Sequence, residues 1–198
     1  MTVARERLSR KSIVEEATRM ISDVGLDQLS LRRLATQLGV TAPALYAHVS
    51  DKGDLLRAIA ETGFGDLIER YELIGGATAR ERIIEFTRCY VDYARDEPEI
   101  FRLMFVFRPH EIRVDAVDNE LDLATQAFDL PARAIAAAIA DGTIHPSRDP
   151  LMTSLMLWTM SHGLATVLLL GMDFDAETRT ALVDGLVEAT VAGLALAP

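Results

Sequence analysis

Residues 25–56 read GLDQLSLRRLATQLGVTAPALYAHVSDKGDLL, and this stretch decides the fold. Ser30 is suited to cap a short helix that ends at Gly39. Thr41 precedes a second short helix, with Pro43 in its first turn, where the missing N–H costs little. Two short helices joined at a glycine are typical of a helix-turn-helix, whose second helix enters the major groove of DNA.

Apolar residues in this stretch have helical spacing and are expected to hold the two short helices at a fixed angle: Leu31, Leu34, Ala35, Leu38, Val40, Leu45 and Val49. The other positions around the second helix then face outward: Thr41, Ala42, Pro43, Ala44, Tyr46, Ala47 and His48. Upstream, apolar residues from Ile13 to Val24 predict a helix that begins near Ser9 or Ser12 and stops at Gly25.

Downstream of the stretch, helical periodicity recurs and strand alternation is nearly absent. Ser50 or Asp51 can cap a fourth helix that continues to about residue 71. We expect further helices at about 79–95, after residue 98, once or twice within 115–140, at 150–170 and at 176–196. Pro131 either opens a new helix or kinks a long one. The predicted fold is all-α with about nine helices: an N-terminal three-helix domain, residues 1–57, and a helical ligand-binding and dimerisation domain, residues 58–198.

Composition excludes several classes of protein. The chain has 198 residues, of which 49% are hydrophobic and 25% charged, so it can bury a core and is not a disordered chain. Its single cysteine, Cys89, excludes a disulfide framework and a cysteine-based zinc site, and fits a reducing cytoplasm. No secretory signal opens the sequence.

Charge is unevenly distributed along the chain. The formal net charge of −10 argues against a nucleic-acid binder when the chain is taken whole. Residues 1–60, however, carry nine basic and seven acidic side chains, while residues 61–198 carry eleven and twenty-three. This asymmetry indicates that the N-terminal end meets a polyanion.

The helix-turn-helix stretch resembles the TetR family of bacterial transcriptional repressors. The resemblance rests on the spacing of these residues: Ser30-Leu31-Arg32, Leu34-Ala35, Leu38-Gly39-Val40, Ala44-Leu45-Tyr46, His48, Lys52 and Leu55-Leu56. It implies that Ser30 caps a helix and binds a phosphate, and that Arg32 reaches a base edge or a phosphate. It also implies that the recognition helix opens against the bases with Thr41, Ala42, Pro43 and Ala44, and that phosphates are contacted by Tyr46, His48 and Lys52.

The recognition helix departs from a donor-rich pattern. Ala42, Pro43, Ala44 and Ala47 offer no side-chain hydrogen-bond donor, so direct readout would depend on Arg32, on Thr41 and on apolar contact with thymine methyl groups. DNA shape is a second source of sequence preference. Alternatively, Tyr46 and His48 pack between helices, and Lys52 is an ordinary surface charge.

The C-terminal part resembles the TetR-type domain named for a Trp-His-Gly signature. The matching stretches are PEIFRLMF at 98–105 and LWTMSHGLA at 157–165. Aromatic residues, methionine and histidine here suit an apolar cavity for a small organic molecule. The candidate ligand-binding residues are Tyr90, Phe101, Met104, Phe105, Trp158 and His162. The alternative is that these side chains are only core, as most buried aromatics are.

The last two helices are the expected dimer interface. Their candidate contact residues are Leu155, Leu168, Leu182, Leu186, Thr190, Val191 and Leu194, and nearby glycines permit close helix approach. The competing interpretation is that this surface completes a monomer core. Residues 151–172 carry no charge and are long enough to span a bilayer, but polar residues within them and acidic flanks favour a buried helix.

These observations favour a cytoplasmic transcriptional regulator: a repressor that binds a palindromic DNA operator as a homodimer and is released by a small apolar molecule. An enzyme is disfavoured, since four scattered histidines and one cysteine give no metal-ligand spacing, and no phosphate-binding glycine loop occurs. No cofactor is expected. The remaining alternative is a helical interaction or assembly protein whose helix-turn-helix does not bind DNA.

Overall fold

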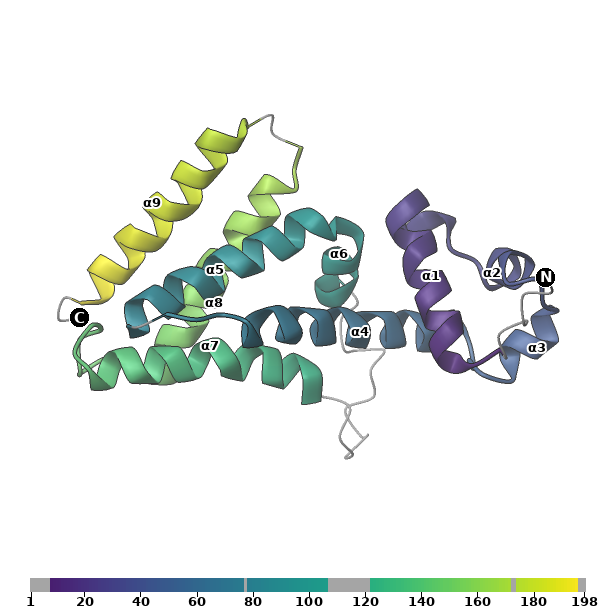
Figure 1. Cartoon of the computed structure of the whole chain (residues 1–198), viewed down its shortest axis with the longest axis horizontal. Coiled ribbons are helices and arrows are strands. Elements are labelled where there is room, and N and C mark those ends of the chain that lie inside the picture. The colour runs from purple at the N-terminus through teal and green to yellow at the C-terminus, as the bar shows by residue number, and fades with distance from the viewer. Residues whose placement is uncertain (1–7, 77, 107–121, 172–173, 196–198) are drawn as a thin grey trace. The chain divides into compact units, whose positions relative to one another are not determined.

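The computed structural model describes residues 8–76, 78–106, 122–171 and 174–195 (Figure 1). The fold is all-α, as predicted, and these residues contain no strand. The elements in chain order are α1 (Arg10–Val24), a 3₁₀ turn η1 (Leu26–Gln28), α2 (Leu31–Gln37), α3 (Ala42–Tyr46), α4 (Lys52–Glu72), α5 (Ala79–Asp96), α6 (Pro98–Val106), α7 (Asp122–Ala140), α8 (Pro150–Leu168) and α9 (Ala176–Leu194).

The chain divides into two compact units. The first combines residues 1–63 with 97–116, and the second combines residues 64–96 with 117–198. Helix α4 contributes its N-terminal half to the first unit and its C-terminal half to the second. The predicted domain boundary between residues 57 and 58 stays a prediction. It did not anticipate that α6 groups with the N-terminal helices, as it does in the structure.

Local capping explains where the first helices begin. Ser9 and Ser12 form a reciprocal capping box at α1, so both serines suggested by the sequence take part. The side chain of Ser30 accepts a hydrogen bond from the Arg33 backbone N–H at the start of α2. Between α2 and α3, Gly39 has a φ of +67°, a left-handed conformation that favours glycine.

The first unit has an aliphatic core drawn from all its helices. Its fully buried side chains include Ile13 and Ile21 of α1, Leu34 of α2, Leu45 of α3 and Leu55 of α4. Because α3 is only five residues long, it depends on this burial for its stability.

Helix α6 packs against α1 and approaches α4 closely. Ser22 of α1 donates a hydrogen bond to the Glu97 carboxylate beside the start of α6 (3.3 Å). A Cβ at Gly63 of α4 would lie 2.8 Å from Ile100 Cγ2 and 2.8 Å from Met104 Sδ. Glycine at position 63 therefore permits the contact between α4 and α6.

In the second unit, α5 is the central helix and contacts α7, α8 and α9. Its buried face includes Ile83, Tyr90 and Tyr93. Helix α7 continues through Pro131, so the proline does not open a new helix but lies inside a single long one, and a kink at this position stays a prediction. The ring of Tyr71, at the end of α4, meets Phe86 of α5 edge to face with centroids 4.9 Å apart.

Helix α8 has an unusual composition for a helix of a compact unit. Within the described residues it is the helix long and apolar enough to cross a membrane, a test that core helices of soluble proteins also pass. Its buried side includes Leu157, Leu164 and Ala165, while Leu151 and Met156 on the same helix are exposed. The structure thus gives α8 one face in the core of its unit and one apolar face outside it.

Exchanging Gly63 for alanine tests the close approach of α4 and α6. In Gly65→Ala the new Cβ would meet nothing within 4 Å, so this variant should gain up to about 1 kcal/mol from the better helix propensity of alanine. In Gly63→Ala, overpacking costs about 1–3 kcal/mol and cancels that gain. Urea unfolding followed by circular dichroism should therefore rank Gly63→Ala below Gly65→Ala. Equal stability of the two variants would contradict the close contact.

Candidate functional site: a nucleic-acid interface and an aromatic cluster

The surface of α3 consists of the residues that the sequence placed there. Thr41 and Pro43 are exposed, and Tyr46 keeps 53% of its surface exposed. Ala42, Ala44 and His48 are half-buried. The Thr41 side chain accepts a hydrogen bond from the Ala44 N–H (3.4 Å) and so caps the helix, while its own hydroxyl proton is still available to donate.

The backbone around α3 is held from inside. Leu45 and Val49 keep 0% and 1% of their surface exposed. Their burial fixes which side of α3 faces the core. Tyr46 follows Leu45 and points its side chain to another side, so its exposure disfavours the interpretation that it packs between helices. His48 is intermediate, and its contact with DNA stays a prediction.

Some basic side chains close to α3 in the sequence form an ion pair with a carboxylate, and others do not. Within the described residues, the exposed side chains of Arg32 and Lys52 have no ion pair. Arg33 donates to the Gln28 side-chain oxygen at 3.4 Å. Arg32 precedes α3 in the chain and Lys52 is the first residue of α4, so the cations lie on both sides of the recognition helix in sequence.

Arg10, by contrast, is held by an acid that sequence inspection did not assign to it. Its guanidinium lies 2.6 Å and 3.0 Å from the two carboxylate oxygens of Asp54, and it also donates to the His48 carbonyl oxygen (3.0 Å). The hydrogen bond from Arg10 lowers the pKa of Asp54 to about 2, against the opposing effect of burial. Asp54 is therefore ionised at neutral pH.

In the second unit, three of the six predicted ligand-binding residues come together. Tyr90 of α5 and His162 of α8 share a hydrogen bond between the phenol oxygen and Nδ1 (2.8 Å). The Trp158 ring stacks on His162, four residues along the same helix, with centroids 5.5 Å apart. Tyr90 is buried, His162 half-buried, and Trp158 39% exposed. We call these three residues the aromatic cluster.

Electrostatically, the aromatic cluster favours neutral groups. Burial raises the pKa of Tyr90 and lowers that of His162, so both are uncharged at neutral pH. Ser161 directly precedes His162 and is buried; its hydroxyl lies 3.4 Å from that of Thr87 and donates to the Leu157 carbonyl oxygen. This part of the unit therefore presents neutral polar groups among aromatic rings.

The other three predicted ligand-binding residues lie on α6, in the first unit. Phe101 and Met104 are buried, and Phe105 is half-buried. The rings of Phe101 and Phe105 are 4.9 Å apart, and Met104 faces Gly63. These contacts fit the alternative that α6 supplies core side chains to its own unit, and a ligand contact at these positions stays a prediction.

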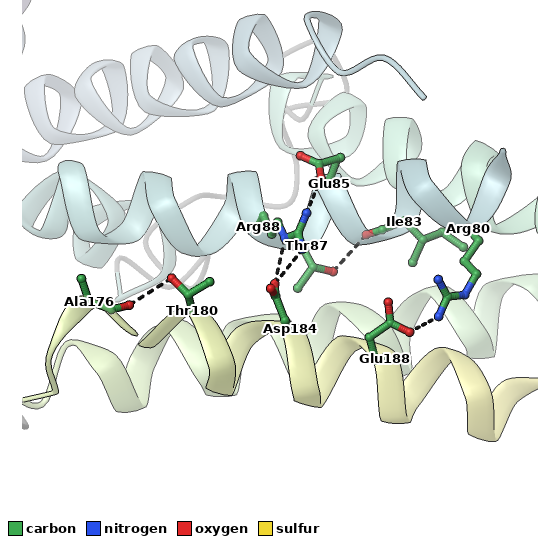
Figure 2. A network of polar contacts seen from close by, with 9 residues as sticks. All are labelled: Arg80, Ile83, Glu85, Thr87, Arg88, Ala176, Thr180, Asp184 and Glu188. Carbon is green, nitrogen blue, oxygen red and sulfur yellow. Dashed lines mark hydrogen bonds and ion pairs between the residues drawn. The ribbon is translucent and has the colours of Figure 1, made fainter. Parts of the chain in front are cut away.

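Helix α9 is attached to α5 by both apolar and ionic contacts. Its buried side consists of Val183, Val187, Val191 and Leu194. Beside that stripe, Arg88 of α5 contacts the Asp184 carboxylate at 2.8 Å, and Arg80 pairs with Glu188 (Figure 2). These contacts fix the rotation of α9 about its own axis.

This orientation of α9 leaves some of the predicted dimer residues exposed and buries others. Leu155, Leu182 and Leu186 are exposed at 36%, 37% and 37%, and Leu168 and Thr190 are half-buried. Val191 and Leu194 keep only 1% and 3% of their surface exposed because they lie on the buried side of α9. Exposure on α9 therefore favours Leu182 and Leu186 as interface residues, and a dimer contact at Val191 and Leu194 stays a prediction.

Metal or thiol chemistry has little basis here. Residues 8–76, 78–106, 122–171 and 174–195 contain no cluster of three or more potential metal ligands from His, Cys, Asp and Glu. Burial raises the pKa of the Cys89 thiol to about 11, so the reactive thiolate is scarce at neutral pH.

Two family models match the chain. Residues 13–59 match the bacterial regulatory proteins of the TetR family, and residues 83–194 match the tetracyclin repressor-like C-terminal domain. The second match contains Trp158, His162 and Gly163, which belong to the stretch on which the resemblance to this type of domain rested. The chain belongs to the TetR family. Its members are DNA-binding transcriptional regulators and not enzymes, which confirms the coarse functional prediction.

Several known proteins resemble the chain over most of its length. An uncharacterized HTH-type transcriptional regulator of Mycobacterium tuberculosis is 30% identical over 180 residues, covering 90% of this chain and 78% of the relative. The class D tetracycline repressor of Escherichia coli is 30% identical over 128 residues, covering 61% of this chain and 55% of the repressor. A solved structure of a protein of unknown function from Rhodococcus sp. RHA1 has a TM-score of 0.81 at 29% identity, covering 96% and 98% of the two chains.

Acidification tests the aromatic cluster of this TetR-family protein. Because burial lowers the pKa of His162 from 6.5, the unfolded chain binds its proton at a higher pH than the folded chain does. The free energy of unfolding should therefore fall as pH drops below about 6.5, and His162→Gln should remove part of that fall. Urea titrations at several pH values measure both.

Tyr90→Phe is the companion variant. It should lower the free energy of unfolding by about 1 kcal/mol, because it removes the hydroxyl that bonds His162, while the histidine still titrates. A His162→Gln protein with the same pH dependence as wild type would show that the ring is not buried as described.

Proposed function

We propose that this protein is a dimeric repressor of the bacterial cytoplasm that binds a roughly palindromic operator and is released by a small organic molecule. The observation that carries the proposal is that Arg32 and Lys52, which precede and follow α3 in the chain, are exposed cations with no carboxylate partner among the described residues. The recognition helix itself supplies Thr41, Pro43 and Tyr46.

Affinity would come mainly from phosphate contacts. Ser30, Tyr46, His48 and Lys52 are the proposed phosphate ligands, with Lys52 aided by the N-terminus of α4. So few contacts per copy give weak binding at physiological salt, and the many acids of the second unit oppose DNA on other surfaces. Both points favour two copies on one site, with recognition helices about 34–36 Å apart or near a multiple of a helical turn.

Specificity would come from few groups. Arg32 and Thr41 can donate hydrogen bonds to base edges, and Ala42, Pro43 and Ala44 suit contact with thymine methyl groups. Because this interface has few side-chain hydrogen-bond donors, much of the preference for one DNA sequence over another would come from DNA shape.

Dimerisation would use the apolar faces that α8 and α9 leave exposed. Leu155 of α8 and Leu182 and Leu186 of α9 are the proposed central contacts, with Leu168 and Thr190 at the edge. Gly185 and Gly193 are exposed on α9, and a Cβ there would meet nothing within 4 Å, so a partner helix can approach closely. A two-fold axis would place the same residues of both copies in contact.

The aromatic cluster is the proposed place of ligand recognition. An uncharged molecule with an aromatic or aliphatic body and one hydrogen-bonding group suits Tyr90, Trp158 and His162. The tetracycline repressor among the relatives is named for a small organic molecule. Repression would be relieved because the ligand favours a state that fits DNA less well. Helix α4, which contributes to both units, is the proposed lever.

DNA binding is tested with a duplex that the wild-type protein selects from a random pool at low salt. We expect Arg32→Ala, Tyr46→Ala and Lys52→Ala each to lower affinity about tenfold, and Arg32→Ala also to relax base preference. The matched control is Arg133→Ala, an exposed arginine of α7 in the second unit, which should bind as wild type does. Failure of the wild-type protein to retain any duplex would refute repression and favour the assembly-protein alternative.

The dimer is tested by sedimentation velocity on Leu182→Glu and Leu186→Glu. Each variant places a charge at the proposed interface in both copies, and we expect the dimer to weaken at least about 100-fold while helicity is kept. Leu73→Glu is the control, because Leu73 is 86% exposed outside α8 and α9. Loss of helicity in place of dissociation would show that this surface completes a monomer core.

A further inference from the structure

An ion pair joins the start of α1 to the start of α4 across 44 residues of sequence. The Arg10 guanidinium contacts both carboxylate oxygens of Asp54, through Nη2 to Oδ1 at 2.6 Å and through Nη1 to Oδ2 at 3.0 Å. This is the two-point arrangement that arginine forms with carboxylates and lysine cannot. The Asp54 side chain is 18% exposed, so the acid is shielded more than a surface acid is.

Both members of the pair also hold the backbone between α3 and α4. Arg10 Nη1 donates to the His48 carbonyl oxygen at 3.0 Å, just after the end of α3. Asp54 Oδ2 accepts from the Ser50 N–H at 2.8 Å. Asp51 Oδ1 accepts from the Asp54 N–H at 2.8 Å and caps α4. The segment 48–54 is therefore tied at several points to one arginine of α1.

The same segment is where DNA contacts are proposed. His48 and Lys52 lie in it, and Tyr46, the last residue of α3, precedes it by two residues. A small rotation of the segment would move His48 and Lys52 together and would shift Tyr46 through this short connection. Arg10 belongs to the basic N-terminal part of the chain, but its guanidinium donates its hydrogen bonds to Asp54 and to the His48 carbonyl oxygen.

We propose that the Arg10–Asp54 pair is a positioning element for DNA recognition, which fixes segment 48–54 against α1 and so aligns Tyr46, His48 and Lys52 with the phosphates. Arg10 acts through Asp54 and not by contacting DNA itself. This inference rests on the DNA interface proposed above. Because the pKa of Asp54 is lowered to about 2, the pair is intact throughout the range of pH in which the protein would work.

Three roles for the pair make opposite predictions. If Asp54 is only an acid near DNA, then Asp54→Asn removes a repulsive charge and tightens binding. If Arg10 is a phosphate ligand, then Arg10→Lys binds almost as wild type does, and Arg10→Gln reduces the salt dependence, the slope of log K against log salt, by about 0.9. If the pair positions the segment, then Asp54→Asn weakens binding although it removes a negative charge.

The test measures the affinity of full-length variants for the duplex selected by wild type, by fluorescence anisotropy between about 50 and about 200 mM salt. For the positioning role we expect Asp54→Asn, Arg10→Gln and Arg10→Lys each to weaken binding about tenfold with an unchanged slope. The double variant Arg10→Gln/Asp54→Asn should be no weaker than the weaker single variant. Melting followed by circular dichroism establishes that each variant is folded at the assay temperature.

Matched controls come from a neighbouring pair on α1. The Lys11 ammonium and the Glu15 carboxylate lie 3.8 Å apart and both side chains are well exposed; within the described residues neither has a hydrogen bond or ion pair with segment 48–54. Lys11→Gln and Glu15→Gln change the net charge as the Arg10 and Asp54 variants do, and neither should weaken binding about tenfold. Hydrogen exchange supplies a readout without DNA, because the Ser50 amide should lose protection in Asp54→Asn and keep it in Glu15→Gln.

The outcomes separate this inference from the proposed function. Wild type that binds a duplex while Asp54→Asn binds equally well or more tightly overturns the positioning role and leaves repression standing. Arg10→Lys at wild-type affinity together with a reduced slope in Arg10→Gln assigns Arg10 to phosphate and also overturns it. Wild type that binds no duplex overturns the proposed function and the positioning role together. Should Asp54→Asn fail to fold, Arg10→Lys alone decides between positioning and phosphate contact.

Discussion

The burial of Leu45 is the constraint on which the first unit depends. A helix of five residues cannot form by itself, since nucleation costs more than so few backbone hydrogen bonds return. Helix α3 exists because Leu45 and Val49 are enclosed by neighbouring helices, with Thr41 and Pro43 fixing its start. Thr41 and Pro43 therefore serve both as exposed residues and as part of the local structure, whereas the exposed Tyr46 takes no part in the caps or the core. A substitution of Tyr46 should accordingly cost the fold less than a substitution of Thr41 or Pro43.

Among the described residues, both units contain paired and unpaired cations. In the second unit Arg70, Arg80, Arg88 and Arg95 are each paired with carboxylates of the same unit. In the first unit Arg10 is paired, while Arg32 and Lys52 have no ion pair within the part of the chain that the structure describes. An overall acidic protein can therefore present a basic surface, because the average charge matters less than which cations are already neutralised.

Sequence predicted those features that depend on residues a few positions apart. The caps at Ser30 and Thr41 and the turn at Gly39 involve partners within four residues, so residue type and spacing were sufficient. Trp158 and His162 are four residues apart, a spacing that puts both on one face of α8, where their rings stack. Pro131 was ambiguous, since a proline inside a helical pattern both opens and bends helices, and neighbouring contacts decide the outcome. Partners far apart in sequence, such as Arg10 and Asp54, left no local pattern to recognise. For α9, apolar residues occur on both faces, so Val191 could not be distinguished from Leu186 until its packing against α5 was known.

The exposed apolar face of α8 has a consequence for the life of the chain in the cell. Leu151, Met152, Leu155 and Met156 lie outside the core of their unit, on a helix that carries no charged side chain between Leu151 and Leu168. If the proposed dimer covers this face, a newly folded single copy displays it to chaperones and to other exposed apolar surfaces. The yield of the protein would then depend on how soon two copies meet, so expression level and solubility would be linked by mass action. A low concentration of the chain would prolong the time that each copy spends unprotected.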